Sequence, residues 1–273
     1  MTWFSLKRTL QSNLASSIEV LNPINQDVPR SNLHTPLRYS AVLLSIGKTT
    51  QICHQNIPLK KVHCNGTVTY ISAISRKLAK EWQQPSDEIA TMLLPLLDED
   101  STQSVWSSVR KTNDGWLEFV ISKRGIEYWQ RQLAQWPLYP PPSTQAWPIK
   151  PEQLWHLQAG YELCCRWRSR YRLVNRQGSC QTSSVGLAPF QIPFKPLQTL
   201  IHCLLDICDS WDQTKASKLL QQVQKLVSAL ENCAGLTELS SEAGTIGPWL
   251  DASRIVLQQS LHGRLGYPLA ERL

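Results

Sequence analysis

Beyond residue 150, apolar side chains recur every three or four residues, the pattern of helices that bury one face. The spacing predicts four helices, over residues 152–172, 196–211, 215–233 and 249–263. Gly263 and Gly266 are expected to end the last helix, because glycine reaches left-handed backbone angles at little cost. Pro268 then prevents the helix from resuming. Residues 175–187 are polar and are expected to form a loop.

The first half of the chain mixes helical and strand patterns. A helix is expected over residues 3–20, and its apolar positions are Phe4, Leu6, Leu10, Leu14 and Ile18. Residues 39–46 and 51–59 are rich in strand formers and flank Gly47-Lys48, which predicts a hairpin.

Two more helices and a strand are predicted before residue 136. The helices cover residues 71–82 and 86–94. Ser86 or Asp87 can cap the second helix, and Pro95 is expected to end or kink it. Residues 116–122 alternate between apolar and polar side chains, as a strand does.

A proline-rich stretch separates the two patterns. Residues 136–150 contain five prolines, which fix the backbone and remove hydrogen-bond donors. The sequence therefore predicts an N-terminal domain over residues 1–135, a linker over 136–150 and a C-terminal domain over 151–273. The expected fold class is an α+β domain, a small antiparallel sheet with helices, followed by an all-α helical bundle.

The amino-acid composition indicates which kinds of molecule the protein is expected to bind. The chain has 273 residues, a net charge of +7 and eleven tryptophans. A basic protein favours anionic partners such as nucleic acid. The first 14 residues lack the apolar core of a signal peptide, and no run of about 18 apolar residues could span a membrane. With eight cysteines in no secreted spacing, we expect a cytoplasmic protein with free thiols and no membrane partner.

The clearest basic feature is one short run within the predicted helix 152–172. Guanidinium groups pair two phosphate oxygens at once, and interleaved aromatic rings can stack on unpaired bases. The run therefore predicts RNA contact; the alternative is a solvated helix end that favours its own dipole. Its candidate residues are Arg166, Trp167, Arg168, Arg170, Tyr171, Arg172 and, beyond them, Arg176.

Further basic residues form weaker candidates. Arg76, Lys77 and Lys80 share the predicted helix 71–82, where a solvated face is the alternative to RNA contact. Toward the end of the chain, Arg254, Arg264 and Arg272 are also candidate RNA-binding residues, although Arg272 could instead pair with a carboxylate.

No catalytic or metal site is predicted. Cys53-His54 and His63-Cys64 contain zinc-binding residue types, but neighbouring residues on a strand face opposite sides, and the spacing is not that of a closed zinc site. Gly47-Lys48-Thr49 lacks the upstream glycine of a phosphate-binding loop. We therefore expect no metal and no cofactor.

The C-terminal residues carry a resemblance to a known family. Ala252-Ser253-Arg254-Ile255-Val256-Leu257 is followed by Leu265-Gly266-Tyr267-Pro268 and Ala270-Glu271-Arg272-Leu273. This order resembles the C-terminus of arginyl-tRNA synthetases, in which an Ala-Thr-Arg-x-Val-Leu helix precedes Leu-Gly-Ile and Pro-Glu-Arg-Met. Residues 157–167 resemble the Tyr-x-Gln-Tyr-Ala-His-Ala helix of that family in a degraded form. The resemblance implies that the all-α domain is a DALR-type anticodon-binding bundle.

The N-terminal part resembles the additional N-terminal domain of the same family, which contacts the tRNA corner at the D-loop. Residues 65–79, 84–90 and Gly115-Trp116-Leu117-Glu118-Phe119 follow the order of its motifs. The His-Gly-Asp triplet of the family is absent here. The catalytic domain would lie between the two parts, yet only the proline-rich linker occupies that place, and no His-Ile-Gly-His-like or Lys-Met-Ser-Lys-like signature occurs.

The resemblance implies a non-catalytic protein that binds a tRNA, one that accepts arginine, at its corner and anticodon stem-loop as an adaptor or chaperone. One alternative is a protein-interaction scaffold derived from a synthetase, which would bind a protein partner through its tryptophans. Arginine–tRNA ligase activity is the third hypothesis, disfavoured by the missing signatures.

Overall fold

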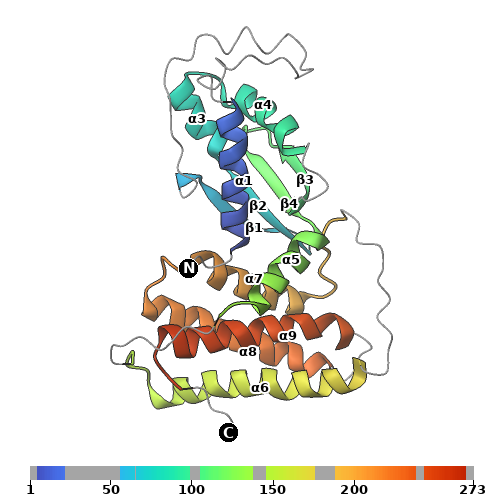
Figure 1. Cartoon of the computed structure of the whole chain (residues 1–273), viewed down its shortest axis with the longest axis vertical. Helices are drawn as coiled ribbons and strands as arrows, with labels where there is room; N and C mark the ends of the chain where they lie inside the picture. The colour runs from blue at the N-terminus through green and yellow to red at the C-terminus, as the bar shows by residue number, and fades with distance from the viewer. Residues whose placement is uncertain are drawn as a thin grey trace. The chain divides into compact units, whose positions relative to one another are not determined.

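The computed structural model describes residues 5–21, 56–64, 66–98, 105–137, 146–175, 188–237 and 243–268. The chain divides into two compact units. One, the sheet unit, comprises residues 7–126 and 186–190; the other, the helical unit, comprises residues 1–6, 127–185 and 191–273. The division falls near Ile126, whereas the sequence placed the end of the first domain at residue 135. The fold is mixed α+β (Figure 1).

The sheet unit is built on four antiparallel strands in the order β1-β2-β4-β3. Tyr70 of β2 lies opposite Phe119 of β4, and Ser72 lies opposite Leu117. A register shift interrupts the β3–β4 pairing between Trp106 and Ser108. The strands are β1 Leu59–Cys64, β2 Thr67–Ser72, β3 Trp106–Lys111 and β4 Leu117–Ile121.

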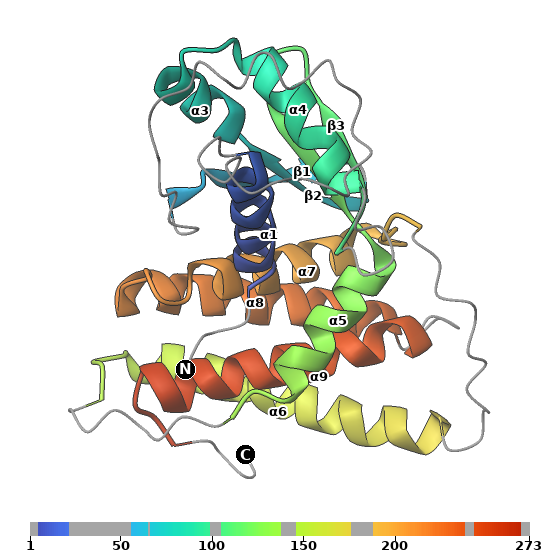
Figure 2. The same ribbon diagram turned by 45° about the horizontal axis from the view of Figure 1, so that its top comes forward.

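One face of this sheet is buried beneath helices. Directly opposed residues of antiparallel strands share a face, so Tyr70, Phe119 and their alternate neighbours form one apolar layer. Both rings are fully buried. Helix α1 (Leu6–Leu21) lies over the sheet, and α4 (Ser86–Asp98) packs on β3 (Figures 1 and 2). Gln11 of α1 donates to the Ile57 carbonyl oxygen at 2.8 Å and fixes α1 beside the start of β1.

Helix α1 confirms the predicted N-terminal helix over its described part. Its positions Leu6, Leu10, Leu14 and Ile18 are all buried, as their spacing of four residues requires. The predicted strand 116–122 is confirmed as β4. The predicted strand 39–46 and Gly47-Lys48 lie outside the described residues.

The prediction was wrong around residues 51–82. The strand begins at Leu59 rather than ending there, and Ile71 belongs to β2, because α3 covers only Ile74–Trp82. Val68, Tyr70 and Ser72, at every second position, are buried on one side of β2, and Thr69 between them is buried as well, so the segment is a strand covered on both faces at that point. The residues between β1 and β2 are Asn65-Gly66, a dipeptide typical of two-residue hairpins, and Gly66 has φ of 75°.

Three elements between residues 86 and 134 differ from expectation. Helix α4 continues through Pro95 to Asp98, so the proline does not end it. Strand β3 was not predicted, and neither was helix α5, Lys123–Ala134. In α5 the buried Ile126, Trp129 and Leu133 are spaced as a helix requires.

Ser122 forms the corner between β4 and α5. Its hydroxyl donates to the Val105 carbonyl oxygen at 3.0 Å and accepts the Gly125 N–H at 2.9 Å. The Ser122 N–H donates to the same carbonyl oxygen at 3.0 Å. Serine before the first helical residue is a preferred cap, since it satisfies one N–H that the helix leaves free.

Replacing Ser122 with alanine should therefore lower the free energy of unfolding by about 1–2 kcal/mol, because the buried Gly125 N–H loses its acceptor. Urea denaturation followed by circular dichroism measures this. Ser107→Ala is the control, since the Ser107 hydroxyl is only half-buried and donates to the Val120 carbonyl oxygen. Equal stability of Ser122→Ala and the wild type would show that this cap contributes nothing.

The helical unit contains the four helices predicted beyond residue 150. Each has a predicted counterpart, but α9 begins six residues earlier than expected and contains Pro248. After α9 the chain widens into a short π-helix, Gln259–Arg264, and the positive φ of Gly266 (77°) ends the helical region. The α-helices are α6 Pro151–Asn175, α7 Lys195–Ser210, α8 Ala216–Thr237 and α9 Ala243–Gln258.

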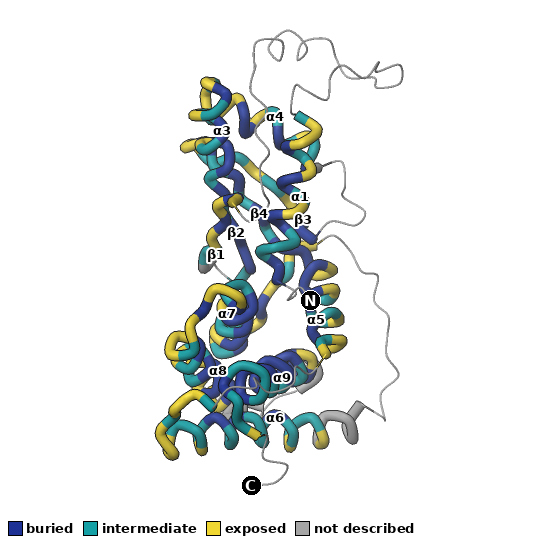
Figure 3. Tube along the Cα trace, turned by 60° about the vertical axis from the view of Figure 1, so that its left-hand side comes forward, coloured by how far each residue is buried: buried dark blue, intermediate teal, exposed yellow. Residues whose placement is uncertain are grey.

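Helix α6 is the least buried of these helices. It contacts α9 and α8, and buried positions are concentrated on α7, α8 and α9 (Figure 3). On α6 only Leu157, Gly160 and Cys164 are buried among the described side chains. A Cβ atom on Gly160 would lie 2.6 Å from a γ-methyl group of Val227 in α8. Glycine at position 160 therefore permits the close packing of α6 on α8.

Candidate nucleic-acid interface

The predicted arginine run lies within α6, so its helical spacing is confirmed. Arg166 is exposed, and its Nε lies 3.4 Å from a carboxylate oxygen of Glu162, one turn earlier. Trp167 and Arg168 are half-buried. The side chains of Arg170, Tyr171 and Arg172 lie outside the described residues, as does Arg176. Arg166 is thus the cation of this run that the structure places in solvent.

Arg168 instead joins α6 to α9. Its Nε lies 2.8 Å from a carboxylate oxygen of Asp251. Further along α9, Arg254 donates to Gln258 Oε1 of the same helix at 3.1 Å, and its charge also acts on Tyr161 of α6. Burial raises the pKa of Tyr161, an effect that the guanidinium of Arg254 partly offsets. Two of the candidate RNA-binding arginines therefore also hold the helical unit together.

Arg264, the last residue of the π-helix that follows α9, also contacts other residues of the helical unit. Its Nη2 donates to the Thr214 carbonyl oxygen at 2.7 Å, and its guanidinium carbon lies 5.6 Å from the centre of the Trp211 ring. Trp136 packs edge-on against Trp211 with ring centres 5.1 Å apart. The cation–π contact gives Arg264 a structural role that was not predicted from the sequence. Arg272 lies outside the described residues.

In the sheet unit, α3 carries the second basic group. Arg76 and Lys80 are exposed, and they are one turn apart on the same side of the helix. The Lys77 ammonium group donates to the Asn56 carbonyl oxygen at 3.2 Å. The Lys77 side chain is therefore held by the segment that precedes β1, while Arg76 and Lys80 are exposed to an anionic partner.

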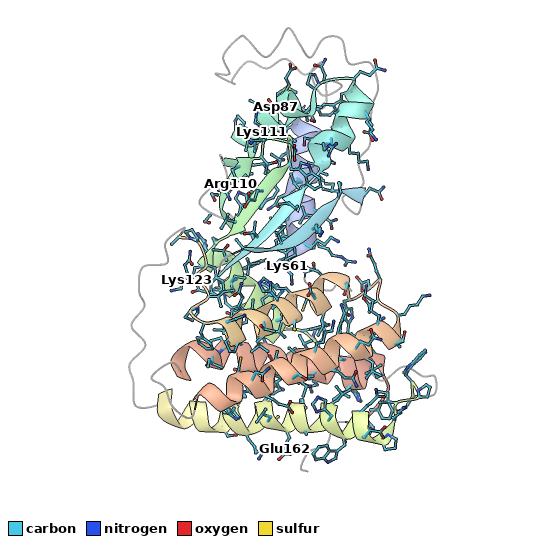
Figure 4. The ribbon with its side chains drawn as sticks, turned by 180° about the vertical axis from the view of Figure 1, so that it is seen from behind. Lys61, Asp87, Arg110, Lys111, Lys123 and Glu162 are labelled. Atoms are coloured by element: carbon cyan, nitrogen blue, oxygen red, sulfur yellow. The ribbon has the colours of Figure 1, made fainter. Side chains whose placement is uncertain are left out.

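Two other cations of the sheet unit are paired. Arg110 of β3 forms a two-pronged contact with Glu118 at 2.8 and 2.9 Å. Lys111 lies 2.7 Å from a carboxylate oxygen of Asp87 at the start of α4. Figure 4 labels Arg110 and Lys111 together with Asp87. Both cations therefore have an acidic partner, and exposed pairs of this kind contribute little to stability.

The described residues give no support to zinc binding or thiol chemistry. They contain no group of three or more His, Cys, Asp or Glu residues that could hold a metal ion. His63 and Cys64 end strand β1, whereas Cys53-His54 lies outside the described residues. Burial raises the pKa of the Cys164 thiol, and it raises that of Cys233 to about 11. These two thiols are protonated at neutral pH and are poor nucleophiles.

Two exposed tryptophans at and just before the start of α6 were not predicted as candidate site residues from the sequence. Trp155 is 63% exposed and Trp147 is 43% exposed, the highest values among the tryptophans described. Periodicity alone marks them as ordinary apolar positions. The exposure of Trp155 follows from the shallow contact of α6, whose buried side chains lie on one narrow stripe.

Comparison with known proteins adds no assignment. No protein-family model matches the sequence, and neither a curated protein nor a solved structure matches it. No described helix has both the length and the apolar character that crossing a membrane requires. The candidate interface therefore stands on its own geometry.

Proposed function

We propose that this protein is a non-catalytic tRNA-binding protein related to arginyl-tRNA synthetase. It binds the corner and the anticodon stem-loop of an arginine-accepting tRNA and acts as an adaptor or chaperone in the cytoplasm. The observation that carries the proposal is the exposed cation of Arg166 at the start of an arginine run on a continuous helix. The ordered sequence resemblance at both ends of the chain supplies the choice of RNA.

The sheet unit supports the same proposal more weakly. Exposed Arg76 and Lys80 on α3 offer a second anionic contact. A phosphate bound at each unit would let one protein hold two parts of a folded RNA. The proposal assigns no chemistry to the protein, because the arginine run and α3 offer binding groups and no nucleophile–base pair.

The proposal predicts that replacing Arg166, Arg170 and Arg172 together with alanine weakens tRNA binding by about tenfold or more at physiological salt. The slope of log affinity against log salt should become shallower by about 2, because roughly 0.7–0.9 is lost for each phosphate contact. Arg168 is left intact, since its removal would also leave Asp251 unpaired. Gel-shift titration of transcribed tRNAs measures both effects.

The matched control removes the same charge from α8 and the residue before it. Lys215, Lys218 and Lys225 are all exposed, and their replacement with alanine should change affinity less than threefold if α6 is the binding surface. Equal losses in both variants would show that only net charge matters. An absence of tRNA binding by the wild type at low salt would end the proposal.

The exposure of Trp155 favours a second candidate function, a protein-interaction scaffold. Co-purification from the native cell with and without ribonuclease separates the two. A partner that persists after ribonuclease favours the scaffold, whereas one that is lost favours RNA binding. Arginine-dependent ATP–pyrophosphate exchange tests the ligase hypothesis, and we expect none.

A further inference from the structure

Trp155 presents an indole ring to solvent on a rigid support. It lies in the second turn of α6, a helix whose opposite side packs on α8 and α9. Scattered apolar residues are normal on protein surfaces, but a tryptophan with 63% of its surface exposed is the largest such group among the described residues. Tryptophan supplies a large flat contact area at a low cost in side-chain entropy.

The segment that leads into α6 is held by the end of the chain. The Trp147 N–H donates to the Leu265 carbonyl oxygen at 3.0 Å, and the Tyr267 hydroxyl donates to the Trp147 carbonyl oxygen at 2.7 Å. The Ile149 N–H donates to the same hydroxyl at 3.2 Å. The backbone at Trp147 is therefore fixed in place, and a ligand at this end of α6 meets a main chain that is already ordered.

The exposed stripe of α6 joins this ring to a cation. Glu162 and Arg166 follow Trp155 by seven and eleven residues, which returns each of them to within about 20° of the same side of an α-helix. Figure 4 shows Glu162 on the side of α6 that faces away from the neighbouring helices. Arg166, with 64% of its side chain exposed, lies about 16 Å along the helix from Trp155 at 1.5 Å per residue.

The ion pair between Glu162 and Arg166 does not block this surface. Both groups are near solvent and 3.4 Å apart, and such pairs contribute at most about 1 kcal/mol. A phosphate can replace the carboxylate as the partner of Arg166, because its oxygens match the planar guanidinium. Beyond Arg166 the helix continues into three more arginines before residue 173 and no acidic residue.

We propose that this stripe of α6 binds an unpaired strand of RNA, with a base stacked on the indole of Trp155 and a backbone phosphate on Arg166. This inference rests on the proposed function and specifies which part of the RNA lies here. A ring and a cation about 16 Å apart match a strand of a few nucleotides, whereas bases inside a duplex are already stacked and expose no face to a side chain. The exposed Arg166, and a sequence between it and residue 173 that contains arginines and no acidic residue, favour RNA over a protein partner.

The test uses the full chain and two fluorescein-labelled RNAs of equal length, a hairpin with an unpaired loop and a blunt duplex. Trp155→Ala should weaken binding of the hairpin by about tenfold, the range expected for one stacked base, and leave duplex binding within about twofold. Its salt slope should match that of the wild type, since stacking involves no counterion. Trp155→Phe should retain most of the affinity. Tyr128→Ala is the control, because Tyr128 is an exposed aromatic residue on α5.

Each outcome decides the inference. If the wild type and Trp155→Ala bind the hairpin equally well, the stacking role is overturned, but the proposed function stands. Equal losses for hairpin and duplex also overturn it, because a duplex has no base to stack. A wild type that binds neither RNA overturns both proposals. A ribonuclease-resistant protein partner lost only in Trp155→Ala would assign the surface to protein instead.

Discussion

Replacing Gly125 with alanine should destabilise the protein by about 3 kcal/mol. A Cβ atom at this position would lie 2.1 Å from the Val105 carbonyl oxygen, far inside the 3.5–4.0 Å at which non-bonded heavy atoms attract. The obstacle is backbone, and Ser122 holds it in place with two hydrogen bonds. Relief requires displacement of α5 from the start of β3, a cost that exceeds the gain of about 1 kcal/mol from replacing a helical glycine with alanine.

Urea denaturation of the full chain, monitored by tryptophan fluorescence, measures this loss of stability. Lys123→Ala, two residues earlier on the same helix, is the control, because its side chain is exposed and its removal should change stability by less than about 0.5 kcal/mol. An unfolding midpoint of Gly125→Ala that matches that of Lys123→Ala would mean that the corner yields easily, contrary to the contact described.

The second large effect is expected at Gly160, where α6 approaches α8. Alanine there would place Cβ 2.6 and 2.7 Å from the two γ-methyl groups of Val227. A valine on a helix has one strongly preferred rotamer, so it cannot turn both methyl groups away. We expect a net loss of about 2 kcal/mol, again measured by urea denaturation, because overpacking outweighs the gain in helix propensity.

A double variant makes this prediction specific. Val227→Ala alone should cost about 2 kcal/mol, since Val227 is fully buried and its removal leaves a void. With Gly160→Ala in the same chain, the new methyl group fills part of that void. The double variant should therefore be at least 1 kcal/mol more stable than the sum of the two losses predicts. Strict additivity would show that the two residues do not compete for one space.

Sequence periodicity predicted those helices whose burial is one-sided and regular. The spacing of Leu10, Leu14 and Ile18 marks α1, and α7 and α8 follow the same rule. The pattern was less decisive for β2, because only Ser72 and Ala73 separate Ile71 from the apolar residues of α3. Strand β3 shows one buried side chain in six, so no apolar alternation marks it. Its place depends on pairing with β4, which is not local information.

The candidate site was predictable in residue type but not in role. The sequence placed arginines on one helix, yet it could not show that Arg168 meets Asp251, more than 80 residues away in the chain. Nor could it separate the exposed Trp155 from the buried Trp129, since both stand in helices with similar neighbours. Pairing and exposure depend on which helices pack together, and only the assembled fold sets that.

The helical unit contains both ends of the chain, and this affects the order in which a nascent chain can fold. Ser5 donates to Asp209 at 2.6 Å, while Leu265 and Tyr267 hold the backbone that precedes α6. Translation delivers α6 long before its main packing partner α9, so the side of α6 that packs on α9 stays uncovered until α9 has been made. The sheet unit, whose strands are complete by Ile121, can fold while the ribosome is still at work.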